Sequence, residues 1–500
     1  MRPTGAGVSI PVVQRQLEER SWPDGPPGEA RTTRGFLLWL AGIVVLAAGL
    51  RLGLLGRYFP ERLVGDEFYY LETATEMARG AGHARQGQAH ANWPPAQAFW
   101  LSLFVDPEPA PGQGQATTLL RAQIFLGTLL VLLIGLLANE LFGARSGLLA
   151  AVLAALNPTL IAFSHTIWSE TLFLVLLTAA LTLAVRVQRG GGNWIVPLAG
   201  LAFGLAGLTR EVAILIAGGV AVWWVWTAVP SVASNSAADS LVRVTHRSRA
   251  ALQGLAMLVI AACVVLPWTW RNYRLLDRFV PVSSVSWMAI RQGNTFARSD
   301  WTRPPVGQVR KFVTEYYADP DEAGRVDRAR KEALALIRAQ QPAWAAKKLV
   351  RNTAMLFNPD SFLFKKISRG AYPKMALWEV RAALVLSCAV YMLTFVGGVL
   401  GIAAARGKGR RMFALGVAGT VYFLHLLALA SPRYRLPILT ILVVYGADAL
   451  GRRFDLGLSK KERWVSALVL AAFFFWCVPY FRADALSLWR AGTYVDPFRP

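Results

Sequence analysis

Two short motifs hold the carboxylates of this chain that are best placed to do chemistry. The first, Asp66-Glu67, opens a stretch with helical spacing and is followed by Tyr69 and Tyr70. A solvated aspartate is ionised at neutral pH, so Asp66 can accept the proton of a hydroxyl group as a general base. Aspartate is also a common helix N-cap, and the spacing leaves both interpretations open. The face that we expect this helix to bury carries Phe68, Leu71, Ala74, Thr75 and Ala78.

The second motif is Ser169-Glu170, which follows His165 closely. A carboxylate at membrane depth is costly unless it is paired or hydrated, which makes Glu170 a functional candidate. Glu170 either caps its helix together with Ser169, or orients an acceptor, or pairs with His165 or a metal ion. A lone histidine here is more often structural, and His165 is kept as a candidate substrate contact beside that interpretation.

Arginines near the end of the chain predict an anion site. Arg433 and Arg435, with Tyr434 between them, come just before Pro437, a residue that suits the first turn of a helix. A helix N-terminus offers free N–H groups and partial positive charge to an anion, so we expect a phosphate site here. The alternative is two arginines held at the membrane interface. Arg210 likewise either reaches the headgroups or contacts a phosphate through its planar guanidinium.

Aromatic residues accompany the first motif. Tyr69 and Tyr70 either line a sugar site or belong to the aromatic belt of the membrane interface. Trp93 precedes Pro94-Pro95, and two prolines predict a rigid turn. Trp93 is the residue of this turn that we include among the candidate substrate contacts. Asn157-Pro158 predicts a kink in an apolar helix.

The elements that position these residues must cross a membrane. The chain has 500 residues, of which 54% are hydrophobic, and its mean hydropathy is +0.38. A soluble protein of this length carries more charge, whereas runs of about 20 apolar residues, enough to cross about 30 Å of hydrocarbon, recur throughout this sequence. The net charge of +23 resides mostly in loops that face anionic headgroups and does not indicate nucleic-acid binding. The three cysteines lie in apolar runs and predict no disulfide framework and no metal site.

We therefore expect an all-α polytopic membrane protein of about 11 transmembrane helices. The expected spans are residues 36–56, 119–141, 147–163, 169–187, 194–209, 212–229, 251–269, 377–404, 411–430, 436–451 and 464–481. Placing the N-terminus in the cytoplasm puts nearly all the basic clusters of the short loops inside, as the positive-inside rule requires. Two long outward segments, 57–118 and 270–376, are exempt from that rule.

This topology divides the chain into parts. We expect a disordered cytoplasmic tail at 1–34, a catalytic membrane module at 35–269, an exoplasmic or interfacial segment at 270–376, C-terminal helices at 377–481 and an exoplasmic tail at 482–500. Within the long second segment, the spacing predicts a helix over 326–339. The mixture of lysines and apolar residues at 344–364, together with Lys365 and Lys366 just beyond it, fits either a membrane-lying stretch or part of a small soluble cap.

Taken in order, the motifs resemble those of the GT-C glycosyltransferases, in particular the branch of protein O-mannosyltransferases and aminoarabinose transferases. The resemblance extends over about residues 36–450 and is carried by seven pieces: Gly65-Asp66-Glu67-Phe68-Tyr69-Tyr70, Trp93-Pro94-Pro95, Leu141-Phe142-Gly143-Ala144-Arg145-Ser146-Gly147, Ser169-Glu170-Thr171-Leu172, Gly207-Leu208-Thr209-Arg210, Pro267-Trp268-Thr269-Trp270-Arg271-Asn272-Tyr273 and Pro432-Arg433-Tyr434-Arg435-Leu436-Pro437.

The resemblance implies a membrane enzyme that takes a sugar from a polyprenyl-phosphate donor and inverts the anomeric centre at the outer membrane face. It implies Asp66 as the catalytic carboxylate, Glu67 as its neighbour and Glu170 as a second acidic position, with Arg433 and Arg435 near the donor phosphate. No cofactor is implied beyond the lipid-linked sugar, and a divalent metal is not indicated. The acceptor is a glycan, a lipid or a protein. Trp93 stands where the aminoarabinose branch has lysine, so a lipid A phosphate acceptor is not implied.

Other functions compete with this one. A lipid flippase or transporter would line a path near the bilayer midplane with charges, often with inverted repeats, and neither is visible in the sequence. A polymerase or ligase of surface polysaccharide would use the same class of donor, and the sequence does not separate it from a single-sugar transferase. A scaffold without chemistry does not account for the motifs.

Overall fold

The computed structural model describes most of the chain, namely residues 33–61, 63, 65–108, 116–228, 237–296, 306–359, 362–368, 370–372, 375–477, 485–486 and 489–490. The tail expected to be disordered at 1–34 lies outside this part of the chain except for its last two residues. Most of the tail expected at 482–500 also lies outside it.

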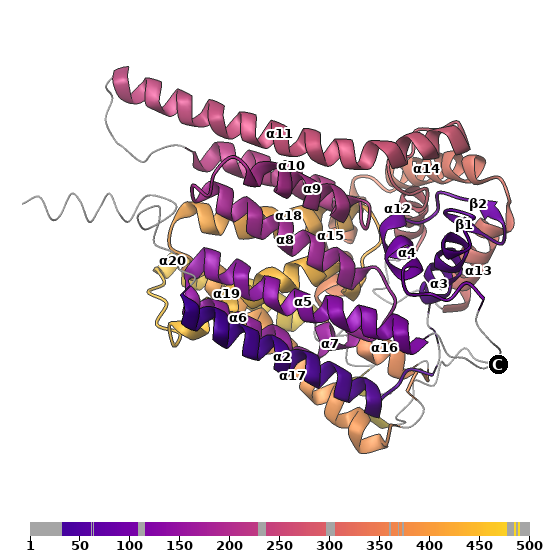
Figure 1. Cartoon of the computed structure of the whole chain (residues 1–500), viewed down its shortest axis with the longest axis horizontal. Coiled ribbons are helices and arrows are strands. Elements are labelled where there is room, and N and C mark those ends of the chain that lie inside the picture. The colour runs from indigo at the N-terminus through magenta and orange to yellow at the C-terminus, as the bar shows by residue number, and fades with distance from the viewer. Residues whose placement is uncertain are drawn as a thin grey trace, which may run out of the picture.

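Long helices that run side by side make up most of the molecule (Figure 1). Each expected span contains at least one helix: α2 (Arg34–Arg57), α5 (Ala116–Phe142), α6 (Ala144–Leu156) with α7 (Pro158–Ser164), α8 (Glu170–Gln188), α9 (Ile195–Gly207), α10 (Val212–Thr227), α11 (Ala237–Leu276), α17 (Leu377–Ala404), α18 (Lys408–Leu427), α19 (Leu436–Gly451) and α20 (Lys460–Ala472), which continues as the π-helical turn η2 (Phe473–Cys477).

The predicted all-α polytopic fold is confirmed. Among the described residues, six helices are each long and apolar enough to cross a membrane, and the bent pair α6–α7 makes a seventh. The six are α2, α5, α8, α11, α17 and α19. The remaining helices are shorter or carry more charge, so the count of about 11 spans stays a prediction.

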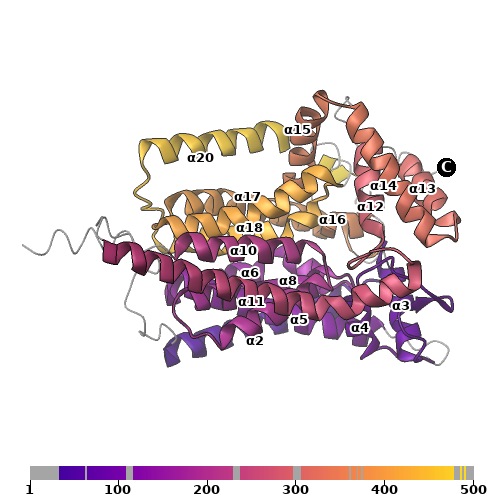
Figure 2. The same cartoon turned by 90° about the horizontal axis from the view of Figure 1, so that it is seen from above.

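Both long outward segments gather at one end of the bundle, as Figures 1 and 2 show from two directions. The first contributes α3 (Glu67–Ala78), the antiparallel strands β1 (Ala84–Arg85) and β2 (Gln88–Ala89), and α4 (Pro95–Ser102). The second contributes α12 (Val285–Thr295), α13 (Val306–Ala318), α14 (Glu322–Ala339), α15 (Ala343–Phe357) and α16 (Phe362–Ser368). Asp66, which precedes α3, therefore lies at this end of the molecule.

Helix α3 buries a different face from the predicted one. The structure buries Glu67, Tyr70, Thr73 and Ala74, while Phe68 is 57% exposed. Of the predicted face, Ala74 is buried but Phe68 is not, because the inward ion pair of Glu67 rotates the buried face of the helix toward Glu67 and Tyr70. An exposed aromatic residue near a membrane does not bear the cost that it would bear in water.

The predicted kink is confirmed between α6 and α7, which meet at 62°. Asn157 caps α7 by accepting a hydrogen bond from the backbone N–H of Thr159 (3.0 Å), and Pro158 begins that helix. The fully buried Arg51 of α2 donates to the carbonyl of Ala155 and to Ser164 on either side of the break (3.3 and 3.2 Å). The guanidinium thus satisfies backbone groups that a broken helix leaves unpaired in an apolar interior.

Helix α19 is held against α17 by small residues. A Cβ atom added at Gly401 of α17 would fall 2.1 Å from the carbonyl oxygen of Tyr445 in α19. Only glycine permits this approach, which is the way membrane helices commonly associate. The contact matters for the site because the short 3₁₀ helix η1 (Pro432–Arg435) leads directly into α19.

The second outward segment forms a helical cap. Helices α12, α13 and α14 share a small core of Met288, Phe312, Tyr316 and Ala329, and α14 confirms the helix predicted over 326–339. Two lysines of this segment are buried, since Lys348 is 2% exposed and Lys366 is 1% exposed. Lys348 donates to the carbonyls of Gly293 and Ala428 (both 3.0 Å), so it joins the cap to the end of α18.

Candidate active site

Four charged side chains from distant parts of the chain meet at the end of the bundle where the two long segments lie. Arg433 lies 2.7 Å from Asp66 and 3.8 Å from Glu170, measured from its Nη1 atom to a carboxylate oxygen of each. Arg210 forms a close ion pair with the same carboxylate of Glu170. Two carboxylates and two guanidinium groups therefore alternate in one cluster, whose formal charges cancel.

Each member lies at the end of a helix or in a short connection between helices. Asp66 precedes α3 as its N-cap residue, yet its side chain makes no capping hydrogen bond and contacts Arg433 instead. Glu170 is the first residue of α8, where Ser169 likewise makes no side-chain cap. Arg210 lies between α9 and α10, and Arg433 lies in η1. The capping interpretation of Asp66 and Glu170 is therefore wrong, because both side chains are engaged by arginines.

Aromatic rings support the two guanidinium groups. Arg433 lies over Trp168 (4.7 Å to the ring centroid) and Tyr434 (4.9 Å), and Arg210 lies 5.5 Å from the ring of Tyr434. A cation over the face of an aromatic ring is stabilised by the ring quadrupole. Tyr70 is buried close by, and burial raises the pKa of its hydroxyl, so that Tyr70 stays protonated and can donate a hydrogen bond.

Glu67 faces the opposite way from Asp66. Its carboxylate accepts hydrogen bonds from Lys366 of α16 (3.0 Å) and from the backbone N–H of Ile167 (3.3 Å), and the side chains of both Glu67 and Lys366 are 1% exposed. Lys366 also donates to the carbonyl of His165 (3.2 Å). Because protein groups supply these hydrogen bonds, the arrangement favours a supporting role for Glu67 around Asp66, and its place in the catalytic set stays a prediction.

His165 is held by the backbone of α2. Its Nε2 atom lies 2.9 Å from the carbonyl oxygen of Arg51, and its side chain is buried. The histidine connects the end of α7 to α2, so the structural interpretation holds and the substrate contact proposed for His165 is not supported. The pairing of His165 with Glu170 is also absent, since the carboxylate of Glu170 faces Arg210.

The predicted pair of arginines in η1 is split. Arg435 donates to the carbonyl of Leu356 (3.0 Å) and to that of Asn358, and its guanidinium stacks 4.0 Å from the ring centroid of Tyr391. It is 2% exposed and anchors η1 to the end of α15. Arg435 is two residues beyond Arg433, which in a 3₁₀ helix turns the side chain by about two thirds of a circle, so the two arginines do not both face the cluster. Arg210 takes the place predicted for Arg435.

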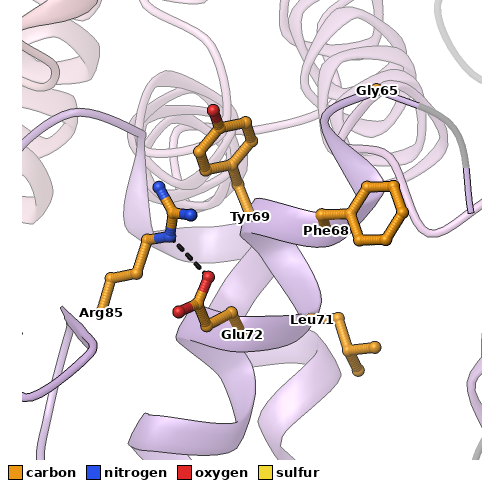
Figure 3. Close-up of a pocket in the computed structure, with 6 residues that line it drawn as sticks. All are labelled: Gly65, Phe68, Tyr69, Leu71, Glu72 and Arg85. Atoms are coloured by element: carbon orange, nitrogen blue, oxygen red, sulfur yellow. Dashed lines mark hydrogen bonds and ion pairs between the residues drawn. The ribbon is translucent and has the colours of Figure 1, made fainter. Parts of the chain in front are cut away.

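The aromatic residues of the first segment form their own group. The ring centroid of Tyr69 lies 5.7 Å from that of Trp93, and the ring of Tyr70 lies 6.1 Å from it. The rigid turn predicted at Trp93-Pro94-Pro95 is present, because α4 begins at Pro95. Tyr69 also lines an open pocket beside Asp66, which Figure 3 shows with Arg85 and Glu72.

Two contributors were missed by reasoning from sequence. Trp168 supports Arg433, and its place next to the Ser169-Glu170 motif was a usable signal. Lys366 gave no signal, since lysines in an apolar segment normally reach toward water. In the described part of the chain, no group of three or more His, Cys, Asp or Glu side chains is arranged to hold a metal ion.

Comparison with known proteins agrees with the predicted resemblance. Residues 111–270 match the family model described as dolichyl-phosphate-mannose-protein mannosyltransferase. No curated protein sequence matches the chain.

Three solved structures are remotely similar. The protein O-mannosyltransferase Pmt1-Pmt2 complex of S. cerevisiae, bound to the sugar donor, is 19% identical over 49% of this chain and 35% of that chain, with a TM-score of 0.40. The oligosaccharyltransferase AglB of Archaeoglobus fulgidus is 17% identical over 90% of this chain and 56% of that chain (TM-score 0.47). ArnT of Cupriavidus metallidurans, bound to undecaprenyl phosphate, is 14% identical over 84% of this chain and 79% of that chain, with a TM-score of 0.37. The chain thus spans about a third of the length of the mannosyltransferase chain and about half of the length of AglB.

Two members of the charge cluster, Glu170 and Arg210, lie inside the matched segment. The other two, Asp66 and Arg433, lie before and after it in the sequence. Over residues 111–270, this helical membrane protein is similar to the dolichyl-phosphate-mannose-protein mannosyltransferase family, as its motifs predicted.

Proposed function

We propose that this protein is an integral-membrane glycosyltransferase, which transfers a sugar from a polyprenyl-phosphate donor to an acceptor with inversion of the anomeric centre. The observation that carries the proposal is the contact between Asp66 and Arg433, which are 367 positions apart in the sequence and 2.7 Å apart in space. A proton acceptor and a phosphate ligand are thereby adjacent at one end of a helical bundle. The family match over residues 111–270 supports the same class of reaction.

Arg433 and Arg210 are the groups that we assign to the donor phosphate. In the reaction, the bond between the anomeric carbon and the phosphate oxygen breaks, and polyprenyl phosphate leaves with the bonding electron pair. Negative charge therefore grows on the phosphate in the transition state. Glu170 and the neighbouring aromatic rings already hold the two guanidinium groups in place. Groups held in this way stabilise the charge of the transition state more than they stabilise the ground state. Such a contact commonly contributes a few kcal/mol to lowering the barrier.

Asp66 is the group that we assign to the acceptor proton. The acceptor oxygen forms its bond to the anomeric carbon on the face opposite the leaving phosphate, and its proton passes to the Asp66 carboxylate. In the structure, that carboxylate is neutralised by Arg433. Arrival of the donor phosphate would give the Arg433 guanidinium a second anionic partner and so weaken its hold on Asp66, which is then free to act. The donor thus prepares the base, which limits proton abstraction to the loaded enzyme.

Glu170 serves as the counter-ion that holds both arginines. It contacts Arg210 and Arg433 with the same oxygen, Oε1, while its buried Oε2 has no hydrogen-bond partner among the described residues. That second oxygen is available to accept a hydrogen bond from a hydroxyl group of the donor sugar. In this role Glu170 binds and orients, and it does not exchange a proton.

The apolar bundle suits a donor with a polyprenyl tail, because the tail stays in the bilayer while its head group reaches the cluster. We assign the cluster to the exoplasmic side of the plasma membrane and the N-terminus to the cytoplasm, on the charge of the short loops. The acceptor is a glycan, lipid or protein on that side.

The test uses the full-length protein in lipid nanodiscs with a panel of polyprenyl-phosphate sugars. Wild type should release polyprenyl phosphate from at least one donor. Asp66→Asn should lower transfer by roughly 100- to 10,000-fold, the contribution usual for a general base. The matched control is Asp277→Asn, at an outward carboxylate that is 88% exposed and outside the cluster, and it should keep full activity. Thermal unfolding of each variant checks that the fold is intact.

Three results would count against the proposal. Full transfer by a folded Asp66→Asn variant would remove Asp66 as the base. Tight binding of the donor without any cleavage would favour a flippase or transporter. Transfer of many sugars in succession to a growing chain would favour a polymerase that uses the same donor.

A further inference from the structure

The pocket beside the charge cluster has a composition of its own. It opens on the first outward segment and is lined by Gly65, Phe68, Tyr69, Leu71, Glu72 and Arg85. Figure 3 shows Glu72 and Arg85 paired on one side, Phe68 on the other, and the Tyr69 ring standing between them. Its volume of about 660 Å³ is in the range of pockets that hold small molecules.

The geometry of α3 puts this pocket next to the proposed base. Tyr69 lies three residues from both Asp66 and Glu72, so it is the common neighbour of these two carboxylates on the surface of the helix. Glu67 and Tyr70 lie on the adjoining face, which is buried in the bundle. A molecule seated against Tyr69 and Glu72 is therefore directed along the helix toward Asp66 and the cluster.

The polar side of the pocket offers a matched donor and acceptor. The Nε atom of Arg85 lies 2.5 Å from Glu72, and both side chains are about a third exposed (37% and 30%). The guanidinium also lies over the ring of Tyr69, 4.3 Å from its centroid. Remaining N–H groups of Arg85 can donate, and the carboxylate of Glu72 can accept, so the pair can bond a hydroxyl group in both directions.

We propose that this pocket is the subsite for a saccharide acceptor, an inference that rests on the proposed glycosyl transfer. Vicinal hydroxyl groups of the acceptor sugar bond to Glu72 and Arg85, and its C–H face packs against the part of the Tyr69 ring that lines the pocket and that the Arg85 guanidinium leaves uncovered. The exposed Phe68 and the neighbouring Leu71 cover the next sugar unit. The hydroxyl that attacks the donor then lies on the Asp66 side of the pocket and gives its proton to that carboxylate.

The charge of the lining argues against a phosphorylated acceptor. Among the six lining residues, Arg85 is the cation and Glu72 the anion, and they are already in contact. A phosphate placed here would gain little from Arg85 and would be repelled by Glu72. A neutral polyhydroxyl ligand is repelled by neither Arg85 nor Glu72, and its hydroxyl groups can accept a hydrogen bond from Arg85 and donate one to Glu72.

The experiment separates donor chemistry from acceptor binding. Full-length protein in nanodiscs is given an active polyprenyl-phosphate sugar, either with water alone or with a set of methyl glycosides and short oligosaccharides. Wild type should transfer to at least one saccharide. Glu72→Gln and Arg85→Met should each raise the KM for that saccharide by roughly tenfold, the effect of losing one good hydrogen bond. Release of sugar to water should stay within about twofold, since the donor contacts are unchanged.

The matched control is Glu76→Gln, one turn further along α3, where the carboxylate pairs with Arg79 (3.5 Å) outside the pocket. It should leave the saccharide KM unchanged. The assignment is overturned if both pocket variants leave that KM unchanged, if they raise the KM of the donor instead, or if only a serine-containing peptide or a phosphorylated lipid accepts the sugar.

A binding measurement without donor keeps the two proposals distinct. Saturation-transfer NMR of the same saccharides should show contact with wild type and loss of contact in the double variant Glu72→Gln/Arg85→Met. Saccharide binding without any donor cleavage would refute the glycosyltransferase while retaining the subsite. Donor cleavage without saccharide binding would do the reverse.

Discussion

At the residue scale, adjacent carboxylates have opposite fates because their surroundings differ. The side chain of Asp66 is partly exposed and belongs to the cluster of alternating charges, whereas the side chain of Glu67 is buried against Lys366 in the interior. Through the N–H of Ile167, Glu67 also touches the turn that carries Trp168 and leads into α8. One buried ion pair therefore connects the elements that present the two carboxylates of the cluster, which makes Glu67 and Lys366 positioning residues.

Variants of this pair should separate stability from positioning. Removing one partner leaves a buried charge uncompensated, so Glu67→Gln or Lys366→Met should each destabilise the protein by roughly 3–5 kcal/mol. The double variant Glu67→Leu/Lys366→Met replaces the pair by apolar groups and should recover most of that stability. Its kcat should nevertheless stay low with little change in donor KM, because Asp66 is no longer held in register.

Thermal unfolding in detergent and steady-state kinetics make the comparison. The matched control is Arg278→Met, which removes the partner of Asp327 from an ion pair that is about half exposed on both sides (48% and 51%) and should leave the unfolding midpoint nearly unchanged. A double variant with wild-type kcat would mean that the pair stabilises the fold only.

At the element scale, the first outward segment is fastened to the bundle by two buried histidines. His83 and His90 lie at the ends of the β1–β2 hairpin with ring centroids 4.6 Å apart, and the ring of His83 lies 4.9 Å from that of Trp268 in α11. Arg271 of α11 donates to the carbonyls of both histidines (3.0 and 2.7 Å). Burial, reinforced by nearby positive charge, lowers the pKa of His83 to about 4 and the pKa of His90 to about 3.

Acid should therefore weaken this attachment. In the unfolded chain both imidazoles take up protons near pH 6.5, whereas in the folded protein they do so only below about pH 4 and 3. The unfolded state thus binds more protons in between, so stability is lost as the pH falls from about 6.5 toward 4. For His83 the loss is on the order of 3 kcal/mol.

The midpoint of thermal unfolding, measured between pH 7.5 and 4.5, tests this expectation. The double variant His83→Gln/His90→Gln should be less stable at pH 7.5 but should show a flatter pH profile than wild type. Because carboxylates titrate in both proteins, the difference between the two profiles reports the histidines. Parallel profiles would show that neither histidine is the acid-sensitive group.

At the scale of the whole molecule, the bundle has two chemically different ends. The charge cluster, the hairpin and the helical cap lie at one end, and the short basic loops, including the one before α20, lie at the other (Figure 1). The cap is joined to the bundle by carboxylates. Glu211, between α9 and α10, accepts from Ser283 (2.9 Å) and Ser286 (2.6 Å), and Glu322 of α14 accepts from the backbone N–H of Ala91 in the first long segment (3.1 Å). The cap therefore stands over the end where the cluster lies.

Cysteine labelling should reveal which end faces out. In a background with Cys263, Cys388 and Cys477 replaced by alanine, Asp277→Cys should react with a membrane-impermeant maleimide in intact cells. Lys460→Cys, at the start of α20, should react only after the membrane is permeabilised. Both native side chains are exposed, so accessibility of the site is matched. The reverse pattern would place the cluster in the cytoplasm and exclude an exoplasmic donor.

The sequence by itself determined the class of protein and the spacing of its motifs. Apolar runs predict helices wherever they occur, because backbone groups in hydrocarbon must bond within their own segment. The breaks at Asn157-Pro158 and Trp93-Pro94-Pro95 follow from the chemistry of proline alone. Asp66, Glu170, Arg210 and Arg433 were all identified in this way, since charge beside an apolar run is costly and invites a function.

Only the tertiary structure decided which of the charged residues face one another. Glu67 differs from Asp66, and Arg435 from Arg433, by one position or two, yet one member of each pair meets the cluster and the other anchors a helix. The reason is physical: a side chain's partner is set by the rotation of its helix and by elements hundreds of residues away. Local spacing in the sequence restricts the rotation of a helix only loosely, and it contains no information about which distant elements pack against that helix.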